Sequence, residues 1–210
     1  MKQYLEETYY IDYSEASIQS LVEAFRPQPT AEQIAGLFLK VRDEWRYNPY
    51  IIFTDQESYR ASTIASKNEG HCIDKATLYI AGLRALGIPA RLRLAKVVNH
   101  IALERLTQKL GIHYIAPHGI AEVYVGDAWR KASTAFNKTL CDKYNVDALE
   151  FDGSQDAVFQ AFNRDSNRFM EYVKDYGHFE DVPLEFILKT FQENYPLLYQ
   201  QFSGQNRINL

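Results

Sequence analysis

The chain has 210 residues, of which 46% are hydrophobic and 24% are charged. This length and balance allow a sizeable buried core and exclude a disordered or fibrous chain. The formal net charge of −4 and the pI of about 5.8 exclude a strongly basic surface, so nucleic acid is not an expected partner.

The N-terminal segment MKQYLEETYYIDYSE carries acidic residues where a signal peptide would have a basic start and an apolar run. The most apolar region, residues 78–98, is not expected to span a membrane, because it contains four basic residues: Arg84, Arg91, Arg93 and Lys96. We expect no membrane association and a cytoplasmic location, where Cys72 and Cys141 would remain reduced.

Two helices are predicted before residue 50. In residues 14–25 the apolar side chains recur at helical spacing, with Ser14 as the candidate cap, and RPQP ends the helix. A second helix is predicted to begin at Thr30 and to end before Asn48 and Pro49. Residues 50–69 have no clean period and are expected to form a loop.

The middle of the chain predicts a helix followed by antiparallel strands. The helix runs from Cys72 to Leu86 and is ended by a glycine and a proline in GIP. The alternating run ARLRLAKVV predicts a strand, and residues 99–111 are expected to hold a short helix. HGIAEVYV and AWRKAST predict two strands joined by a turn at Gly126 and Asp127.

Beyond Cys141, three aromatic-rich stretches have mostly helical spacing: DALEFDGSQDAVFQAF, RFMEYVKDYG and PLEFILKTFQENYPLLYQQF. We expect them to pack around the core. No internal repeat or long linker divides the chain. The prediction is one α+β domain over residues 1–210, with helical flanks at 1–39 and 138–210.

Cys72 is the candidate nucleophile. It follows a glycine-containing loop and begins the predicted helix, where unpaired backbone N–H groups and the helix dipole would lower the thiol pKa. The same N–H groups could stabilise an oxyanion formed on an attacked carbonyl. The competing interpretation is a small apolar residue that only packs.

A nucleophilic cysteine needs an imidazole base that folding brings close to it. His71 adjoins Cys72 and is expected to point away from it. His100 and His113 lie in a connecting segment, and His178 lies in the aromatic C-terminal region. His118 begins a predicted strand, which would hold its ring rigidly.

The stretch GHCIDKATLYIAGLRALGIPARLR resembles the first signature of the transglutaminase-like superfamily, in which a glycine-preceded cysteine begins a helix that ends in a GIPAR-type turn. HGIAEVYVGDAWRK resembles the second signature, a histidine at the start of a strand followed by a tryptophan-bearing strand. Both occur in the family's order and cover roughly residues 40–137. The segments ETYYIDYSE, FDGSQD and MEYVKDYGHFEDVP also resemble bacterial members.

The resemblance implies a papain-like α+β core with a nucleophile helix packed on an antiparallel sheet. It assigns Cys72 as nucleophile and His118 as base of a Cys-His-Asp type triad. The third position departs from the family, because WRKASTAFN places Ser133 where an aspartate is usual. A neutral Ser133 could orient the imidazole but could not stabilise an imidazolium by charge, and Asn137 or Asp127 could take its place.

Trp129 and Trp45 are candidate substrate-binding residues that could shield a thioester from water, although core packing is the more common role of tryptophan. A zinc site built from His71, Cys72, His113 and His118 matches no standard ligand spacing. We therefore expect no metal and no cofactor.

The leading hypothesis is a cysteine enzyme that attacks an amide or peptide bond and forms a thioester, with a peptide or protein amide as substrate. Hydrolysis is favoured over cross-linking, because no site for an amine acceptor is visible. The alternative is a catalytically weak or inactive module of the same fold that binds a peptide, which the serine at position 133 would favour. A third hypothesis is a subunit that binds a partner through its C-terminal aromatic surface.

Overall fold

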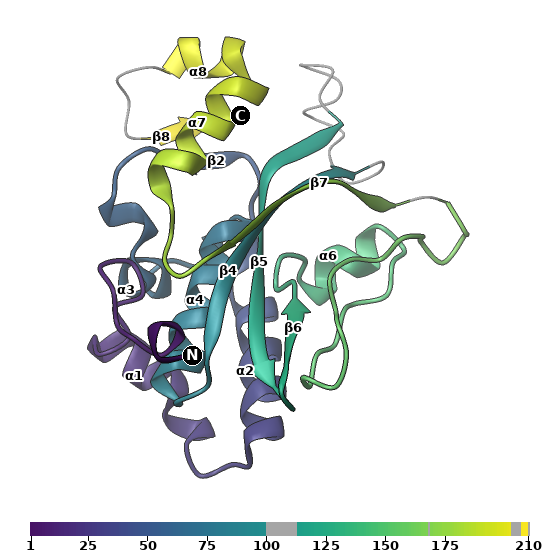
Figure 1. Cartoon of the computed structure of the whole chain (residues 1–210). Coiled ribbons are helices and arrows are strands. Elements are labelled where there is room, and N and C mark those ends of the chain that lie inside the picture. The colour runs from purple at the N-terminus through teal and green to yellow at the C-terminus, as the bar shows by residue number, and fades with distance from the viewer. Residues whose placement is uncertain (100–112, 168, 203–206, 210) are drawn as a thin grey trace.

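The structure of the protein is a computed structural model that describes residues 1–99, 113–167, 169–202 and 207–209 (Figure 1). Its α-helices are α1 (Ala16–Val22), α2 (Thr30–Glu44), α3 (Ala61–Ala65), α4 (Cys72–Ala85), α6 (Lys138–Lys143), α7 (Leu184–Asn194) and α8 (Pro196–Phe202). Its strands are β1 (Arg46–Tyr47), β2 (Ile51–Phe53), β3 (Glu69–Gly70), β4 (Ala90–Asn99), β5 (Tyr114–Val125), β6 (Ala128–Ala132), β7 (Met170–Phe179) and β8 (Arg207–Asn209). Short 3-10 helices cover Lys2–Tyr4, Glu23–Phe25 and Glu57–Tyr59.

Four antiparallel strands form the main sheet in the order β6-β5-β4-β7. β5 and β6 form the predicted hairpin, and the turn residues Gly126 and Asp127 have φ values of 57° and 58°, as a two-residue type I′ turn requires. β6 is the shorter strand: its pairing ends at Ala121 opposite Ala132. The mixed fold with an antiparallel sheet confirms the predicted α+β class.

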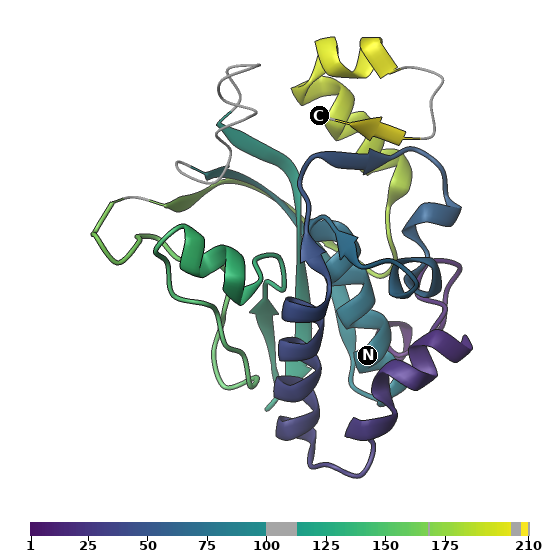
Figure 2. The same cartoon turned by 180° about the vertical axis from the view of Figure 1, so that it is seen from behind.

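Helix α4 is the central helix and packs on one face of this sheet, with α1, α2 and α3 around it (Figures 1 and 2). Its side chains are buried from Cys72 to Arg84, which explains why its sequence is apolar on nearly every side. The helix ends where the sequence predicts, because Gly87 adopts a φ of 77° that favours glycine. α4 and its neighbours form the larger hydrophobic core.

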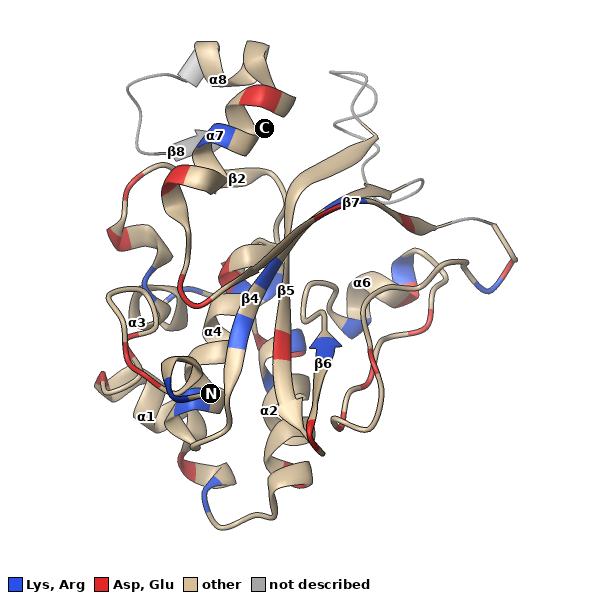
Figure 3. Cartoon of the chain, viewed as in Figure 1, with Lys and Arg blue, Asp and Glu red and all other residues tan. Residues whose placement is uncertain are grey.

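The opposite face of the sheet has two parts. Near the β5–β6 turn, Glu122 accepts hydrogen bonds from Arg91 and Arg93 at 2.6 and 2.8 Å, and basic positions of β4 lie beside an acidic position of β5 (Figure 3). Farther from the β5–β6 turn, a second apolar cluster packs between the sheet and α6 with the segment after it. Ile120 and Cys141 belong to this cluster. One face of the sheet therefore packs on α4, and the opposite face carries these ion pairs and the second cluster.

Three predictions about secondary structure are wrong. DALEFDGSQDAVFQAF, residues 147–162, was expected to be mostly helical, but it contains no helix. RFMEYVKDYG was expected to be a helical flank, but its residues from Met170 onward belong to β7, which pairs with β4 at the edge of the sheet. Residues 50–69 were expected to be a loop, but they contain β2, a 3-10 helix, α3 and β3. The helix expected at 99–111 lies outside the described residues apart from Asn99, which ends β4.

The C-terminal helices α7 and α8 lie at the end of the sheet where β5 begins (Figure 1). Phe191, Tyr195 and Leu198 form a small buried cluster there, and β8 pairs with β2. The helical prediction for this stretch is confirmed. None of the described helices is long and apolar enough to cross a bilayer.

Candidate active site

The first turn of α4 is held by a reciprocal cap. His71 is the N-cap residue, and its Nδ1 accepts hydrogen bonds from the backbone N–H groups of Ile73 and Asp74 at 3.1 and 3.2 Å. The carboxylate of Asp74 accepts a hydrogen bond from the backbone N–H of His71 at 3.2 Å. This capping box fixes the start of the helix, and with it the position of Cys72.

The helix start lies unusually close to β5. A Cβ atom on Gly119 would lie 2.7 Å from the Cα of Ile73, closer than two carbon atoms can approach. Only glycine therefore allows α4 to begin here. The close approach also brings the backbone N–H of Gly119 to the Cys72 sulfur, to which it donates a hydrogen bond.

The Cys72 thiol is buried, with 4% of the residue exposed. Burial raises its pKa to about 12, against the opposite effect of hydrogen bonds from the backbone N–H groups of Gly119, Ile73 and Cys72 itself. The expectation of a lowered thiol pKa is therefore wrong for this conformation: loss of solvation outweighs the helix N-terminus. At neutral pH the resting group is a thiol.

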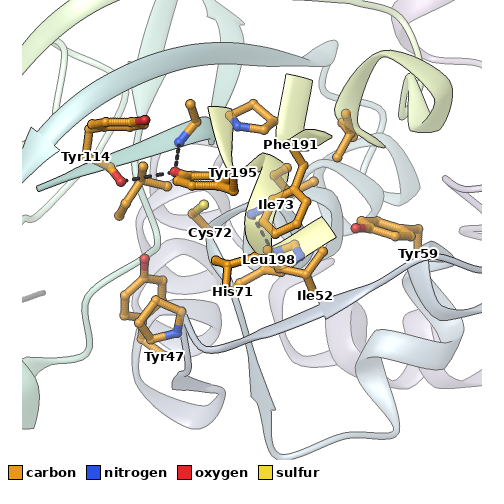
Figure 4. A pocket seen from close by; sticks show the side chains of 15 residues that line it. Tyr47, Ile52, Tyr59, His71, Cys72, Ile73, Tyr114, Phe191, Tyr195 and Leu198 are labelled. Atoms are coloured by element: carbon orange, nitrogen blue, oxygen red, sulfur yellow. Dashed lines mark hydrogen bonds between the residues drawn. The ribbon is translucent and has the colours of Figure 1, made fainter. Parts of the chain in front are cut away.

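Cys72 lines a largely apolar cavity (Figure 4). Its walls come from β1, β2, the first turn of α4, the start of β5, and the C-terminal helices. Tyr195 closes it on one side: its hydroxyl accepts a hydrogen bond from the Ala116 N–H at 2.8 Å and donates one to the Tyr114 carbonyl at 3.0 Å. The C-terminal helices thus form part of the wall next to the thiol.

His118 directly precedes Gly119 in the chain, but its side chain lies on the other face of β5. Successive side chains of a strand point to opposite faces, and Ile120 belongs to the second apolar cluster whereas Ala121 belongs to the core around α4. His118 is buried and lines a second, smaller cavity together with Ser133. The structure therefore brings His118 and Ser133 to one place.

Cys72 and His118 line different cavities. Across the described part of the chain no hydrogen bond joins the sulfur to the imidazole, and the Nδ1 of His118 is buried without a partner. Burial, with His71 as a lesser cause, lowers the pKa of His118 to about 4. Both groups are therefore neutral at pH 7, and their pairing stays a prediction.

The sequence profile described as the transglutaminase-like superfamily matches residues 19–134, which is more than half of the chain. The chain belongs to the transglutaminase-like superfamily. A search of curated proteins found no match.

Among solved structures, this transglutaminase-like chain is similar to a protein from Cytophaga hutchinsonii that carries the provisional name cysteine protease. The two share 13% identity with a TM-score of 0.48, and the match covers 81% of this chain and 62% of the other protein. The family is one of cysteine-dependent enzymes, which agrees with the coarse functional prediction. The family assignment itself stands on the sequence match.

The proposed substitutes for the family's aspartate lie elsewhere. The side-chain amide of Asn137 is already occupied, because it donates to the carbonyls of Arg42 and Trp45 at 2.5 and 2.9 Å and accepts from the Tyr47 N–H at 2.7 Å. Asp127 lies in the turn beyond Val125, where β5 ends, and the strand from His118 to Val125 alone spans roughly 23 Å. Ser133 is the candidate that shares a cavity with His118, although no hydrogen bond between them occurs within the described residues.

The two tryptophans occupy packing positions and line neither cavity. Trp45 is buried and donates its indole N–H to the Ile64 carbonyl at 3.1 Å. Trp129 packs against Tyr4, and the Arg91 guanidinium lies 3.9 Å from its ring centroid. Their geometry gives the predicted substrate-binding role no support. The search of the described residues found no cluster of potential metal ligands.

Several residues at the site were not singled out from the sequence. Gly119 directly follows His118, the candidate base. This HG dipeptide was the sequence feature that could have identified Gly119 as part of the site. Tyr195 carried no local signal, because it meets β5 only through the tertiary fold. Tyr47 lines the cavity, is buried, and has a hydroxyl without a hydrogen-bond partner in the structure as described.

Proposed function

We propose that this protein is a cysteine-dependent acyl-transfer enzyme that hydrolyses an amide or peptide-like bond through a thioester on Cys72. The observation that carries the proposal is the position of the sulfur: it begins α4, accepts the Gly119 N–H, and lines a cavity. A backbone N–H group directed at this point can also stabilise the oxyanion that forms when a carbonyl is attacked.

In the proposed reaction the Cys72 sulfur forms a bond to the substrate carbonyl carbon while its proton passes to His118. The C–N bond then breaks, and the leaving amine takes that proton. Water next attacks the thioester and gives one proton to His118; the C–S bond breaks, and His118 passes that proton to the sulfur as the carboxylic acid leaves. Because the resting thiol is neutral, proton transfer must accompany the attack rather than precede it.

His118 is the proposed base because its Nδ1 is buried and lacks a partner in the described structure, so it is free to accept a proton. The contact with the sulfur has to form when substrate binds. Because the two groups line different cavities without substrate, the proposal requires that substrate binding brings the imidazole to the sulfur. Ser133 is the proposed orienting residue, since it shares the cavity of His118.

The decisive experiment uses a peptide acyloxymethyl ketone, which alkylates a nucleophilic thiol, followed by mass spectrometry of the labelled peptide. We expect labelling at Cys72 that is lost in Cys72→Ala and unchanged in the control Cys141→Ala. His118→Gln should slow labelling by about 10²-fold or more, as expected for loss of a general base. Labelling of Cys141 with an inert Cys72 would overturn the proposal.

A second candidate function, a peptide-binding module without catalysis, is favoured by one observation: the sulfur and the imidazole line separate cavities. This candidate predicts that the protein binds a peptide without cleaving it and that His118→Gln changes neither binding nor labelling.

An amine acceptor added to a cleavage assay separates hydrolysis from transfer, because transfer would yield the new amide.

A further inference from the structure

The cavity at Cys72 has a chemical character of its own. The side chains that line it are aliphatic or aromatic apart from Cys72 and His71, and no Asp, Glu, Lys or Arg side chain is among them in the described part of the chain. The Nδ1 of His71 is committed to the cap of α4. A charged group placed in this cavity would therefore lose its hydration without gaining an ionic partner.

The hydroxyl groups of the lining tyrosines differ in one respect. Those of Tyr59, Tyr114 and Tyr195 donate to the backbone carbonyls of Phe53, Asn194 and Tyr114 at 3.0 Å each. The hydroxyl of Tyr47 has no partner in the structure as described, although only 7% of that residue is exposed.

Figure 4 shows Tyr47 beside Cys72, with its hydroxyl directed toward the same space as the sulfur. A buried hydroxyl without a partner is costly to a protein. A bound molecule that offers one uncharged acceptor or donor would remove that cost.

We propose that this cavity binds the acyl side of the substrate, next to the bond that Cys72 attacks, and that it selects an uncharged apolar side chain over a charged one. This inference rests on the proposed function. The Tyr47 hydroxyl forms a single hydrogen bond to a neutral group of the substrate, such as an amide.

The test compares acyloxymethyl ketone probes that share a leaving group and differ only in the side chain next to the ketone: Phe, Glu and Lys. The measured quantity is the second-order rate of labelling at Cys72. We expect the Phe probe to react at least about a hundredfold faster than the Glu and Lys probes, because a charge has no partner in the cavity.

Neighbouring residues of α8 provide matched variants. Leu198 lines the cavity, whereas Leu197 is 73% exposed. Leu198→Lys should raise the Glu-to-Phe rate ratio about tenfold or more, and Leu197→Lys should leave the ratio at its wild-type value. Leu198→Glu should favour the Lys probe in the same way, so the result does not depend on one variant folding well. Circular dichroism and thermal unfolding confirm the fold of each.

Tyr47→Phe tests the hydroxyl. Removing an unpaired buried hydroxyl should leave the melting temperature unchanged or raise it, while labelling by the Phe probe slows about tenfold. A lowered melting temperature with unchanged labelling would mean that the hydroxyl stabilises the folded protein and does not bind substrate. That result would overturn this part of the inference.

The outcomes separate the two proposals. If Phe, Glu and Lys probes all label Cys72 at equal rates, the chemistry stands and the selectivity is overturned. If no probe labels Cys72, the proposed function fails and the selectivity falls with it.

Discussion

His118 is an imidazole that the fold keeps neutral. Burial lowers its pKa to about 4, with His71 as the second cause, and its Nδ1 is one of the buried polar atoms without a partner in the described structure. A buried polar atom left unpaired costs about 1–3 kcal/mol. An unpaired buried atom needs an explanation, and the proposed role of His118 as a base supplies one.

This burial predicts a pH dependence of stability. Because the pKa of His118 is lowered in the folded state, the unfolded chain binds a proton at this residue first, from about pH 6.5. The contribution of this group to stability should therefore fall as the pH falls from about 6.5 to about 4, by roughly 3 kcal/mol in total. Below about pH 4 this group contributes no further change.

Urea unfolding between pH 4 and 7 measures the effect. His118→Gln should show a shallower loss of stability across the window than the wild type, whereas His178→Gln, on the exposed part of β7, should match the wild type. The wild type and the His118 variant share all other titrating groups. If the free energy of unfolding of both falls equally steeply with pH, the buried neutral imidazole is contradicted.

The sequence placed Cys72 correctly at the first residue of α4, because a glycine-containing loop before a helical period is a local pattern. It could not predict the thiol pKa. That value depends on burial by the C-terminal helices, whose residues lie more than a hundred positions later in the chain, and no local pattern reports which side chains will cover a thiol.

At the scale of elements, the decisive contact is the one between the start of α4 and β5. The two backbones meet where Gly119 has no side chain, and the same contact supplies the N–H that reaches the sulfur. Adding one methyl group here should push the helix start away from the strand.

We predict that Gly119→Ala lowers the free energy of unfolding by about 1–3 kcal/mol, as expected for overpacking, and slows labelling of Cys72. Gly36→Ala is the matched control: its new Cβ would also lie 2.7 Å from a neighbour, but that neighbour is the ring of Phe25, which can move. Alanine also favours a helix, so Gly36→Ala should change stability by less than about 1 kcal/mol. Equal losses in both variants would contradict the prediction.

Other elements show where pattern analysis succeeds and fails. The β5–β6 hairpin was predictable because Gly126 and Asp127 occupy a turn that needs positive φ. β7 was not predictable, because half of the residues of this edge strand are exposed, four of them in succession. Two register shifts in its pairing with β4 also disturb the alternation that identifies a strand. α3 has five residues, too few to be stable without tertiary packing.

At the scale of the whole molecule, one buried amine joins three segments. The Nζ of Lys75 on α4 donates hydrogen bonds to the carbonyls of Arg42 and Trp45 at 2.7 Å each and to the carbonyl of Ala135 at 2.9 Å. The end of α2 and the segment after β6, which follows Ser133, are thereby held against the nucleophile helix. Helical periodicity cannot distinguish such a lysine from an exposed one.

Lys75→Met should remove the side-chain donor of the Ala135 carbonyl and leave those of Arg42 and Trp45 with the Asn137 amide as their side-chain donor. We expect it to lower the free energy of unfolding by about 1–3 kcal/mol. Lys138→Met is the control, because that side chain is 61% exposed and forms an i,i+4 ion pair with Asp142 on the same helix. Its effect should be within about 0.5 kcal/mol. Chemical denaturation of both variants measures the difference, and a stable Lys75→Met protein would show that Asn137 alone joins these segments.

The part of the cavity wall that α7 and α8 contribute is absent while the chain is still being synthesised. The ribosome makes Cys72 and the start of β5 well before it makes Tyr195 and Leu198. During that interval the sulfur has no C-terminal helices beside it and is open to water and to oxidants. A group that is well protected in the mature protein is therefore exposed while translation is under way, and damage to it would depend on the speed of synthesis.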